Sequence, residues 1–470
     1  MAASNDKPAV EYTAQAASPL VNGEVKLKVK ENSFIAAGLF DVAEIPYSRV
    51  NALEFENYNI TARTDDGDYT FSRMGSWATP FFEALRDAYN KAVLRAFFVR
   101  GNPMFTATGD YRFTENGVTV NNGKAPIHVY DTCVVALPPN SNARRIPLCF
   151  VTGMDKKDVE VTLTLNNGDS YAFSKLGYET AGFAERVENN IRALREKTIE
   201  AVTEIDPTLT ASQASQVSKL LTEGVAAPMG QLAAISSSFS AAVDKKLAQT
   251  RAADSYRTLK EMCDPSQIWV GLKKNDIRQD GGDGPDGPLV EPDAPEESMP
   301  VDEGGAADAA PDPYLFWMIA PSPDGQHTAV EFAVKPGESA ATFVYRTGGN
   351  VLVSASHLNR ALEAISFKRE VIRLTEEELL KPENIDYFMA AKRTASLKYV
   401  RANFVARVIH SSPEAWKRKL TELWNKGAAQ SVRPAQPTTA PSGESCPACG
   451  MALTQGMKFC GGCGAKIDQK

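Results

Sequence analysis

A short block of sequence occurs twice in this 470-residue chain, and it constrains the fold more than any other feature. Residues 67–75 read Gly-Asp-Tyr-Thr-Phe-Ser-Arg-Met-Gly, and residues 168–177 read Gly-Asp-Ser-Tyr-Ala-Phe-Ser-Lys-Leu-Gly. Each block begins at the Gly of an Asp-Gly or Asn-Gly pair, which is typical of a tight turn between antiparallel strands. After each block the apolar residues recur every three or four positions, as in an amphipathic helix. The repeat therefore predicts two similar domains, each with several strands followed by one helix.

The similarity between the two copies extends to the residues before the block. The run 128–137 resembles the run 45–53 at an offset of about 84 residues, whereas the block itself repeats at an offset of 101 to 102. This difference predicts an insertion of roughly 17 residues in the second copy, around residues 138–145. Residues 1–22 precede the first alternating strand pattern, and we expect them to form a disordered leader.

Several short antiparallel strands closed by one C-terminal amphipathic helix resemble the pleckstrin-homology-like (PH-like) fold, a small, strongly bent sheet with a helix at one end. The resemblance implies PH-like domains at residues 23–100 and 101–204. Members of this superfold bind phosphoinositides, peptides or each other, so the fold alone does not select a ligand. Lys26, Lys28 and Lys30 alternate along one predicted strand and would suit an anionic lipid. A solvated strand face is the more common explanation of such a pattern.

The remainder of the chain predicts a helical connector and a third domain, so the fold class is α+β multidomain. Residues 205–264 show only helical periodicity, with one long helix expected from Met229 to about Met262. Residues 265–426 predict an α+β domain with a strand at 268–272, an apolar strand at 314–320, a hairpin at 328–346 and helices from 356 to 426. Residues 279–312 are rich in Asp, Glu, Pro and Gly, so we expect a disordered acidic loop between two strands of one sheet.

Basic residues gather in the last two predicted helices of the third domain, interleaved with Tyr399, Phe404, Trp416 and Trp424. Such a pattern can bind nucleic acid or another anionic surface. Aromatic residues that pack inward beneath a charged, solvated face are more common. A third hypothesis places the acidic loop on this basic face, so that deletion of residues 280–311 would strengthen binding to anionic partners. The candidate anion-binding residues are Lys392, Arg393, Lys398, Arg401, Arg407, Lys417, Arg418 and Lys419.

Four cysteines near the C-terminus follow a flexible, Pro/Ser/Thr-rich linker at residues 427–445. Cys446 and Cys449 form one Cys-x-x-Cys pair, Cys460 and Cys463 form another, and a Gly follows each pair. Four thiolates at this spacing predict one structural Zn²⁺ in a closed tetrahedral site. The pattern Cys-Pro-x-Cys-Gly, Lys-Phe-Cys-x-x-Cys-Gly-x-Lys resembles the small zinc-ribbon modules of bacterial and archaeal proteins. The resemblance implies a ribbon at residues 446–470 that zinc folds and that can dock on protein or nucleic acid.

Composition and the absence of catalytic motifs exclude several classes of function. A formal net charge of −7 argues against a protein that coats nucleic acid along its whole length. No apolar run is long enough to cross a membrane, and the first residues lack a secretory signal. Cys133, Cys149 and Cys263 are scattered, as expected for buried thiols in a reducing cytoplasm. We find no nucleophile elbow, phosphate loop, dinucleotide fingerprint or zinc-protease motif, and therefore expect no enzyme.

We expect a cytoplasmic, non-enzymatic scaffold or adaptor that binds protein partners, or a copy of itself, through the tandem domains and the zinc ribbon. Two other classes stay open. A nucleic-acid-binding factor would use the basic helices at residues 392–426 and the ribbon, and its binding would depend steeply on salt. A peripheral membrane adaptor would bind anionic lipid through the repeated domains. An enzyme would require a site assembled between domains.

Overall fold

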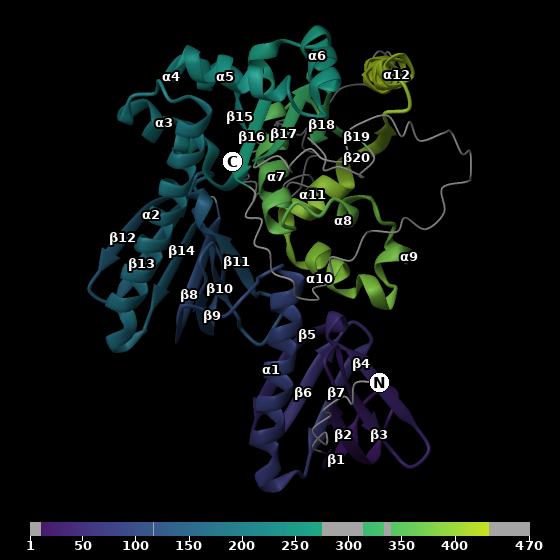
Figure 1. The fold of residues 1–470 in the computed structure, drawn as a ribbon. Coiled ribbons are helices and arrows are strands. Elements are labelled where there is room, and N and C mark those ends of the chain that lie inside the picture. Colours follow the sequence, from purple (N-terminus) through teal and green to yellow (C-terminus); the bar gives the residue numbers. More distant parts are fainter. Residues whose placement is uncertain (1–10, 116, 275–313, 333–339, 432–470) are drawn as a thin grey trace, which may run out of the picture. The chain divides into compact units, whose positions relative to one another are not determined.

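The computed structural model describes residues 11–115, 117–274, 314–332 and 340–431 (Figure 1). Residues 1–421 form one compact unit, and residues 422–470 belong to a second. The first unit contains two seven-stranded sheets, a helical segment and a six-stranded sheet, all antiparallel where strands pair. This architecture confirms the predicted α+β multidomain class. No helix in the described residues is both long and apolar enough to span a bilayer.

The first sheet domain comprises strands β1 to β7 and helix α1, in the sheet order β4-β3-β2-β1-β7-β6-β5. Strand β1 lies within the predicted disordered leader, so that prediction is wrong for residues 11–17, because pairing with β2 and β7 orders them. The elements are β1 Glu11–Ala17, β2 Gly23–Val29, β3 Ser33–Ala37, β4 Val42–Pro46, the 3-10 turn η1 Tyr47–Arg49, β5 Val50–Glu56, β6 Asn59–Thr64, β7 Gly67–Ser72, η2 Gly75–Trp77 and α1 Ala78–Ala96.

The second sheet domain repeats this topology, with the sheet order β11-β10-β9-β8-β14-β13-β12 followed by helix α2. Its elements are β8 Phe105–Glu115, β9 Val118–Val129, β10 Cys133–Ala136, β11 Arg144–Pro147, η3 Leu148–Phe150, β12 Val151–Lys157, β13 Glu160–Leu165, β14 Ser170–Ser174, η4 Gly177–Glu179 and α2 Thr180–Ile205.

From β3 onward the two domains correspond at a nearly constant offset, which corrects the predicted insertion. Tyr47 begins η1, and Leu148 begins the equivalent η3 101 residues later. The run 128–137 is the end of β9 plus β10 and is not the counterpart of residues 45–53. The loop between β10 and β11 spans residues 137–143, whereas residues 38–41 separate β3 from β4, and β8 and β9 are also longer than β1 and β2. Apolar alternation looks alike in every strand of a sheet, so it cannot tell one strand from its neighbour.

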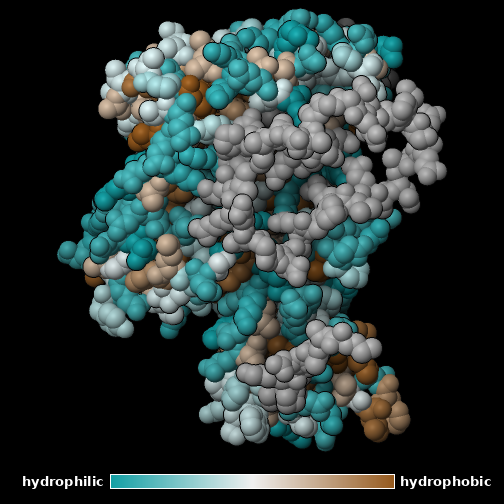
Figure 2. Space-filling model, in the orientation of Figure 1, coloured by the Kyte–Doolittle hydropathy of each residue, from teal (hydrophilic) through white to brown (hydrophobic). Residues whose placement is uncertain are grey.

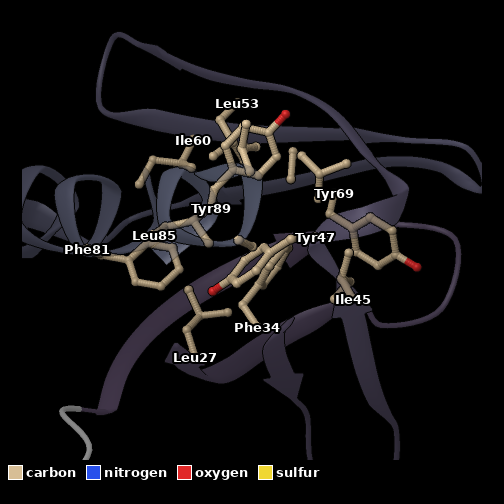
Figure 3. Packing of buried hydrophobic residues seen from close by; sticks show 14 of the residues in the cluster. Leu27, Phe34, Ile45, Tyr47, Leu53, Ile60, Tyr69, Phe81, Leu85 and Tyr89 are labelled. Atoms are coloured by element: carbon tan, nitrogen blue, oxygen red, sulfur yellow. The ribbon is translucent and has the colours of Figure 1, made fainter. Parts of the chain in front are cut away.

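The phenylalanine of the repeated block packs beneath the following helix in both domains. Phe71 on β7 meets Phe81 of α1 edge to face with ring centroids 6.3 Å apart, and Phe173 on β14 lies 5.1 Å from Phe183 of α2. Figure 3 shows Phe81 within the buried cluster of the first domain. The glycine that ends each block has a positive φ, so the chain can turn there into the helix. The block therefore joins sheet to helix in each domain.

The helical segment holds four helices where one long helix was predicted for its second half. They are α3 Ala211–Leu221, α4 Met229–Ile235, α5 Ser237–Leu247 and α6 Ala253–Met262. Ser236 separates α4 from α5, because its backbone is extended and its side chain caps α5 by accepting from Phe239 N. The apolar stripe therefore belongs to successive short helices.

The third sheet domain has the strand order β15-β16-β17-β18-β19-β20. Strands β16 and β17 pair directly, so the predicted acidic loop does connect neighbouring strands of one sheet, although residues 275–313 lie outside the described residues. The prediction of helices from residue 356 to 426 is wrong for residues 404–409, where β20 pairs with β19. The elements are β15 Ala227–Pro228, β16 Trp269–Lys274, β17 Tyr314–Pro321, β18 His327–Phe332, β19 Ala341–Arg346, α7 Val351–Ala364, α8 Glu370–Arg373, α9 Glu376–Leu379, α10 Ile385–Arg393, α11 Ala395–Asn403, β20 Phe404–Ile409 and α12 Pro413–Ser431.

The loop between β10 and β11 joins the second domain to both of the others. Pro139 O accepts a hydrogen bond from Leu53 N at 2.7 Å, and Asn51 O accepts one from Ser141 N at 2.7 Å, so the loop covers the edge strand β5. From the third domain, Arg393 donates to Asn140 O at 3.4 Å. The residues predicted as an insertion are therefore a short junction loop.

Candidate protein-interaction site

The loop between β3 and β4 presents exposed apolar side chains on a fixed backbone. Leu39 is 86% exposed, Phe40 is 90% exposed, and Val42 at the start of β4 is 67% exposed. Gly38 N donates to Asp41 O at 2.8 Å, which closes the turn. We call Leu39, Phe40 and Val42 the apolar tip. Figure 2 shows strongly apolar residues gathered at one end of the first domain.

The exposure of the apolar tip is unusual because three large apolar residues occur within four positions. Single exposed apolar residues are common, whereas contiguous apolar patches often mark interaction sites. Among the described large apolar residues, only Tyr178 in the second domain is more exposed than Phe40. Tyr178 belongs to η4, so it is an exposed aromatic residue outside the tip.

One carboxylate belongs to the loop of the apolar tip, and a second is exposed on the neighbouring strand β2. Asp41 lies within the same loop, and the backbone of Glu24 on β2 lies against Gly38. Among the described residues, neither carboxylate forms an ion pair. Lys26, next on the same face of β2, pairs with Glu11 at 3.6 Å. The tip therefore combines apolar anchors with negative charge, which opposes attraction to an anionic bilayer.

The strand lysines considered for lipid binding lie on the solvent face of the first sheet. Lys26 and Lys28 alternate with buried Val25 and Leu27 along β2. Lys30 pairs with Glu44 at 3.2 Å, and hydrogen bonds from Ser33 and then Lys30 lower the pKa of Glu44. These contacts describe a solvated strand face with local ion pairs.

The predicted anion-binding residues do not form one continuous surface in the structure. Arg393 turns inward and donates to Tyr89 Oη at 2.8 Å, and Arg407 lies on strand β20. Lys417 pairs with Glu261 of α6 at 3.0 Å, while Arg418 and Lys419 are exposed on α12. The structure brings together only Lys392, Lys398 and Arg401.

These three cations line a pocket of about 480 Å³ between α8, α10, α11 and β20. Its apolar wall includes Ile372, Leu374, Phe388 and Phe404, and its cations are Arg373, Lys392, Lys398 and Arg401. Glu376 is the one carboxylate among the lining residues. We call this hollow the basic pocket. An apolar group that carries neighbouring negative charge would match its lining.

Two of the pocket cations also hold the surrounding structure together. Lys392 Nζ lies 2.8 Å from Asp65 of the first domain, and Arg401 donates to Glu376 at 2.8 Å and to Val371 O. Burial acts to raise the pKa of Asp65, but hydrogen bonds from Lys392 and Asn51 lower it overall. Arg373 and Lys398 are both exposed at the pocket. These two are therefore the cations best placed to meet a partner.

A buried polar cluster that the sequence did not reveal lies beside β20. Glu331 is 1% exposed and accepts a hydrogen bond from Thr342 Oγ1 at 2.5 Å. Thr342 Oγ1 also lies 2.9 Å from His410 Nε2 and accepts from Trp416 Nε1 at 2.8 Å. Thr342 is fully buried, so the cluster binds α12 to the sheet and offers no accessible nucleophile. These residues are far apart in sequence, and no local pattern signals their convergence.

Of the three scattered cysteines, Cys133 is buried, as predicted, whereas Cys149 and Cys263 are half-buried. Cys133, Cys149 and Cys263 form no disulfide. Burial raises the pKa of Cys133 to about 11 and that of Cys263 to about 12, so little thiolate exists at neutral pH.

The predicted zinc ligands Cys446, Cys449, Cys460 and Cys463 lie outside the described residues, and the zinc site stays a prediction. Within the described part of the chain, no group of three His, Cys, Asp or Glu side chains is arranged to hold a metal. A scan of protein-family models finds no match to this chain, and a search of curated proteins finds none either.

Proposed function

We propose that this protein is a non-enzymatic scaffold or adaptor whose first sheet domain binds a protein partner through the apolar tip. The observation that carries the proposal is the near-complete exposure of Leu39 and Phe40 on a closed turn. A rigid turn loses little conformational entropy on binding, so its apolar area can contribute fully to affinity. Leu39 and Phe40 have no packing role in the domain that presents them.

The proposal includes PH-like identity for both sheet domains and a zinc ribbon as a tethered second module. The shared strand order and the helix that follows each sheet support PH-like identity. Two similar domains joined by a short junction loop suit a protein that presents surfaces side by side. The ribbon rests on the cysteine spacing alone.

The experiment compares proteins that copurify with the full chain from its native cells. The Leu39→Ser/Phe40→Ser variant should lose one or more specific partners that the wild type retains, because the apolar anchors are gone. Tyr178→Ser is the matched control, since it removes an even more exposed aromatic residue elsewhere. Equal thermal midpoints would show that both variants fold. An unchanged partner set for the tip variant would contradict the proposal.

Nucleic-acid binding is the second candidate, and the basic pocket is the observation that favours it. The pocket cations Lys398 and Arg373 are exposed, but Lys392, Arg401 and Lys417 are held in ion pairs within the chain. Few basic residues are then available for phosphates, so a steep salt dependence is not expected. Tight binding to single-stranded oligonucleotides that weakens by orders of magnitude with added salt would favour this candidate instead.

A further inference from the structure

We infer that this protein self-associates head to tail, with the apolar tip of one copy inserted into the basic pocket of a second copy. The inference rests on the proposed function, because it names the partner of the same tip. Leu39 and Phe40 are almost fully exposed within one chain, so they do not occupy that chain's own pocket.

The tip dictates the chemistry of its partner. Leu39 and Phe40 need an apolar hollow, and Asp41 in the same loop needs positive charge around the mouth of that hollow. A carboxylate adjacent to the two apolar residues would be repelled by an acidic rim, and a neutral rim would add no electrostatic attraction. A partner must therefore combine apolar walls with exposed cations.

The basic pocket of the same protein has this combination. Phe388, Phe404 and Leu374 supply apolar wall, and its volume of about 480 Å³ is within the range of sites that hold small organic groups. Lys398 and Arg373 are exposed at the pocket and can face Asp41 of the second copy. Four cations against one carboxylate give the lining a positive balance.

The small area of the tip determines the expected affinity of the contact, and the use of two different surfaces determines how many copies can assemble. An aromatic residue buries about 150–250 Å², so a contact centred on this tip lies below the roughly 1,200 Å² of a standard stable interface. We therefore expect a weak, reversible contact with a dissociation constant on the order of 10 μM. Tip and pocket are different surfaces, so a dimer still has one free tip and one free pocket, and further copies can add.

The test measures the mass of the full-length protein by sedimentation velocity, from about 1 to about 100 μM. The weight-average mass of the wild type should rise at least twofold over this range and fall again in high salt, because screening weakens the charge contacts. Leu39→Ser/Phe40→Ser should stay monomeric. Lys398→Glu, which reverses a rim charge, and Ala402→Trp, which fills the pocket at an exposed position, should also stay monomeric. Tyr178→Ser should behave as the wild type.

A mixing experiment separates this contact from any other mode of association. The tip variant keeps its pocket and the Ala402→Trp variant keeps its tip, so a mixture should form a one-to-one dimer and nothing larger. A monomeric wild type throughout, self-association that survives the tip substitutions, or a tip variant that dimerises alone would each overturn the inference. Tip-dependent binding of the wild type to phosphatidylcholine/phosphatidylserine vesicles without self-association would also overturn it.

Failure of this inference and failure of the proposed function give different results. If the wild type is monomeric but the tip substitutions still remove a copurifying partner, self-association is wrong and the proposed function stands. If the tip substitutions change neither the mass nor the partner set, both are wrong.

Discussion

Among the described residues, Arg145 and Glu363 form a deeply buried ion pair between two domains of the first unit. Nη1 and Nη2 of Arg145 donate to the two carboxylate oxygens of Glu363 at 2.5 and 2.6 Å. The side chains of Arg145 and Glu363 are only 8% and 12% exposed. Burial acts to lower the pKa of Arg145, but the adjacent Glu363 carboxylate raises it overall. The pair therefore stays charged, and the opposite charge of each side chain offsets the cost of burying the other.

Removal of one partner should be far more damaging than removal of both. Glu363→Ala should lower the free energy of unfolding by about 3–5 kcal/mol, because it leaves a buried guanidinium unpaired. The Arg145→Met/Glu363→Leu double variant should recover most of that loss. Glu54→Ala, which breaks the exposed bidentate pair with Arg63, is the control and should change stability little. Urea denaturation provides the measurement, and similar losses for Glu363→Ala and Glu54→Ala would contradict the prediction.

Half-buried histidines should make stability depend on pH. Burial, and then the nearby Arg360, lower the pKa of His357 from its ordinary 6.5, and burial also lowers the pKa of His128. A lowered histidine pKa means that the unfolded chain binds protons more readily than the folded chain. The stability that the neutral histidines contribute is fully present above pH 6.5, their pKa in the unfolded chain. It is lost as the pH falls through their lower pKa in the folded chain. The free energy of unfolding should therefore decrease below about pH 6.5.

The variant His357→Phe tests the contribution of one such group. His357 stacks on Tyr399 with ring centroids 4.0 Å apart, and a phenyl ring can keep that contact without binding a proton. The slope of unfolding free energy against pH between 7 and 5 should become shallower in this variant. An identical slope in variant and wild type would show that His357 does not titrate differently in the two states.

At the level of elements, strands β16 and β17 meet at a glycine that permits an unusually close approach. The indole of Trp317 on β17 crosses Gly271 on β16 and donates from Nε1 to Gly224 O at 2.6 Å. A Cβ atom built at Gly271 would lie 2.0 Å from Nε1 and 2.5 Å from Gly224 O. Because residue 271 has no side chain, the Trp317 indole can reach across the sheet and hold the turn that follows α3 through its hydrogen bond to Gly224 O.

Gly271→Ala should break this junction. The added methyl would displace the Trp317 indole or the Gly224 carbonyl, and overpacking of this kind costs about 1–3 kcal/mol in addition to the lost hydrogen bond. Gly153→Ala is the matched control, because Gly153 also lies in a strand and a Cβ there would make only an ordinary 3.8 Å contact with Thr164. Thermal unfolding should show a clear loss for the first variant and little change for the second. Equal thermal midpoints for the two variants would contradict the predicted steric conflict at residue 271.

At the level of the whole molecule, the predicted zinc ligands and the folded sheets belong to different units. All four cysteines lie in residues 422–470, whereas the sheets lie in residues 1–421. Structural zinc contributes its binding energy to the segment that it folds. The stability of the sheets should therefore not depend on whether zinc is bound.

Metal analysis should find one zinc ion per chain, held by the four cysteines. Cys446→Ser/Cys449→Ser should abolish the bound zinc, whereas Cys133→Ser and Cys263→Ser should retain it. Chelation should leave the thermal midpoint of the sheets unchanged, because no predicted ligand lies within the first unit. Zinc retained in the double variant would disprove the ligand assignment, and a shifted midpoint would disprove independence.

Turn signals and apolar periodicity are local properties, so the amino-acid sequence predicted the repeated sheets, the helix after each sheet and the pairing of the strands on either side of the acidic segment. The predicted position of the junction loop was wrong, and so was the prediction of helix for β20. Residues 404–409 form a strand because they pair with β19, which is far from them in sequence. The convergence of Lys392, Lys398 and Arg401 in one pocket, and the inward turn of Arg393, follow from helix packing. The exposure of Leu39 and Phe40 was likewise decided only by the tertiary structure, because an apolar pair in sequence does not show whether the folded domain will bury it.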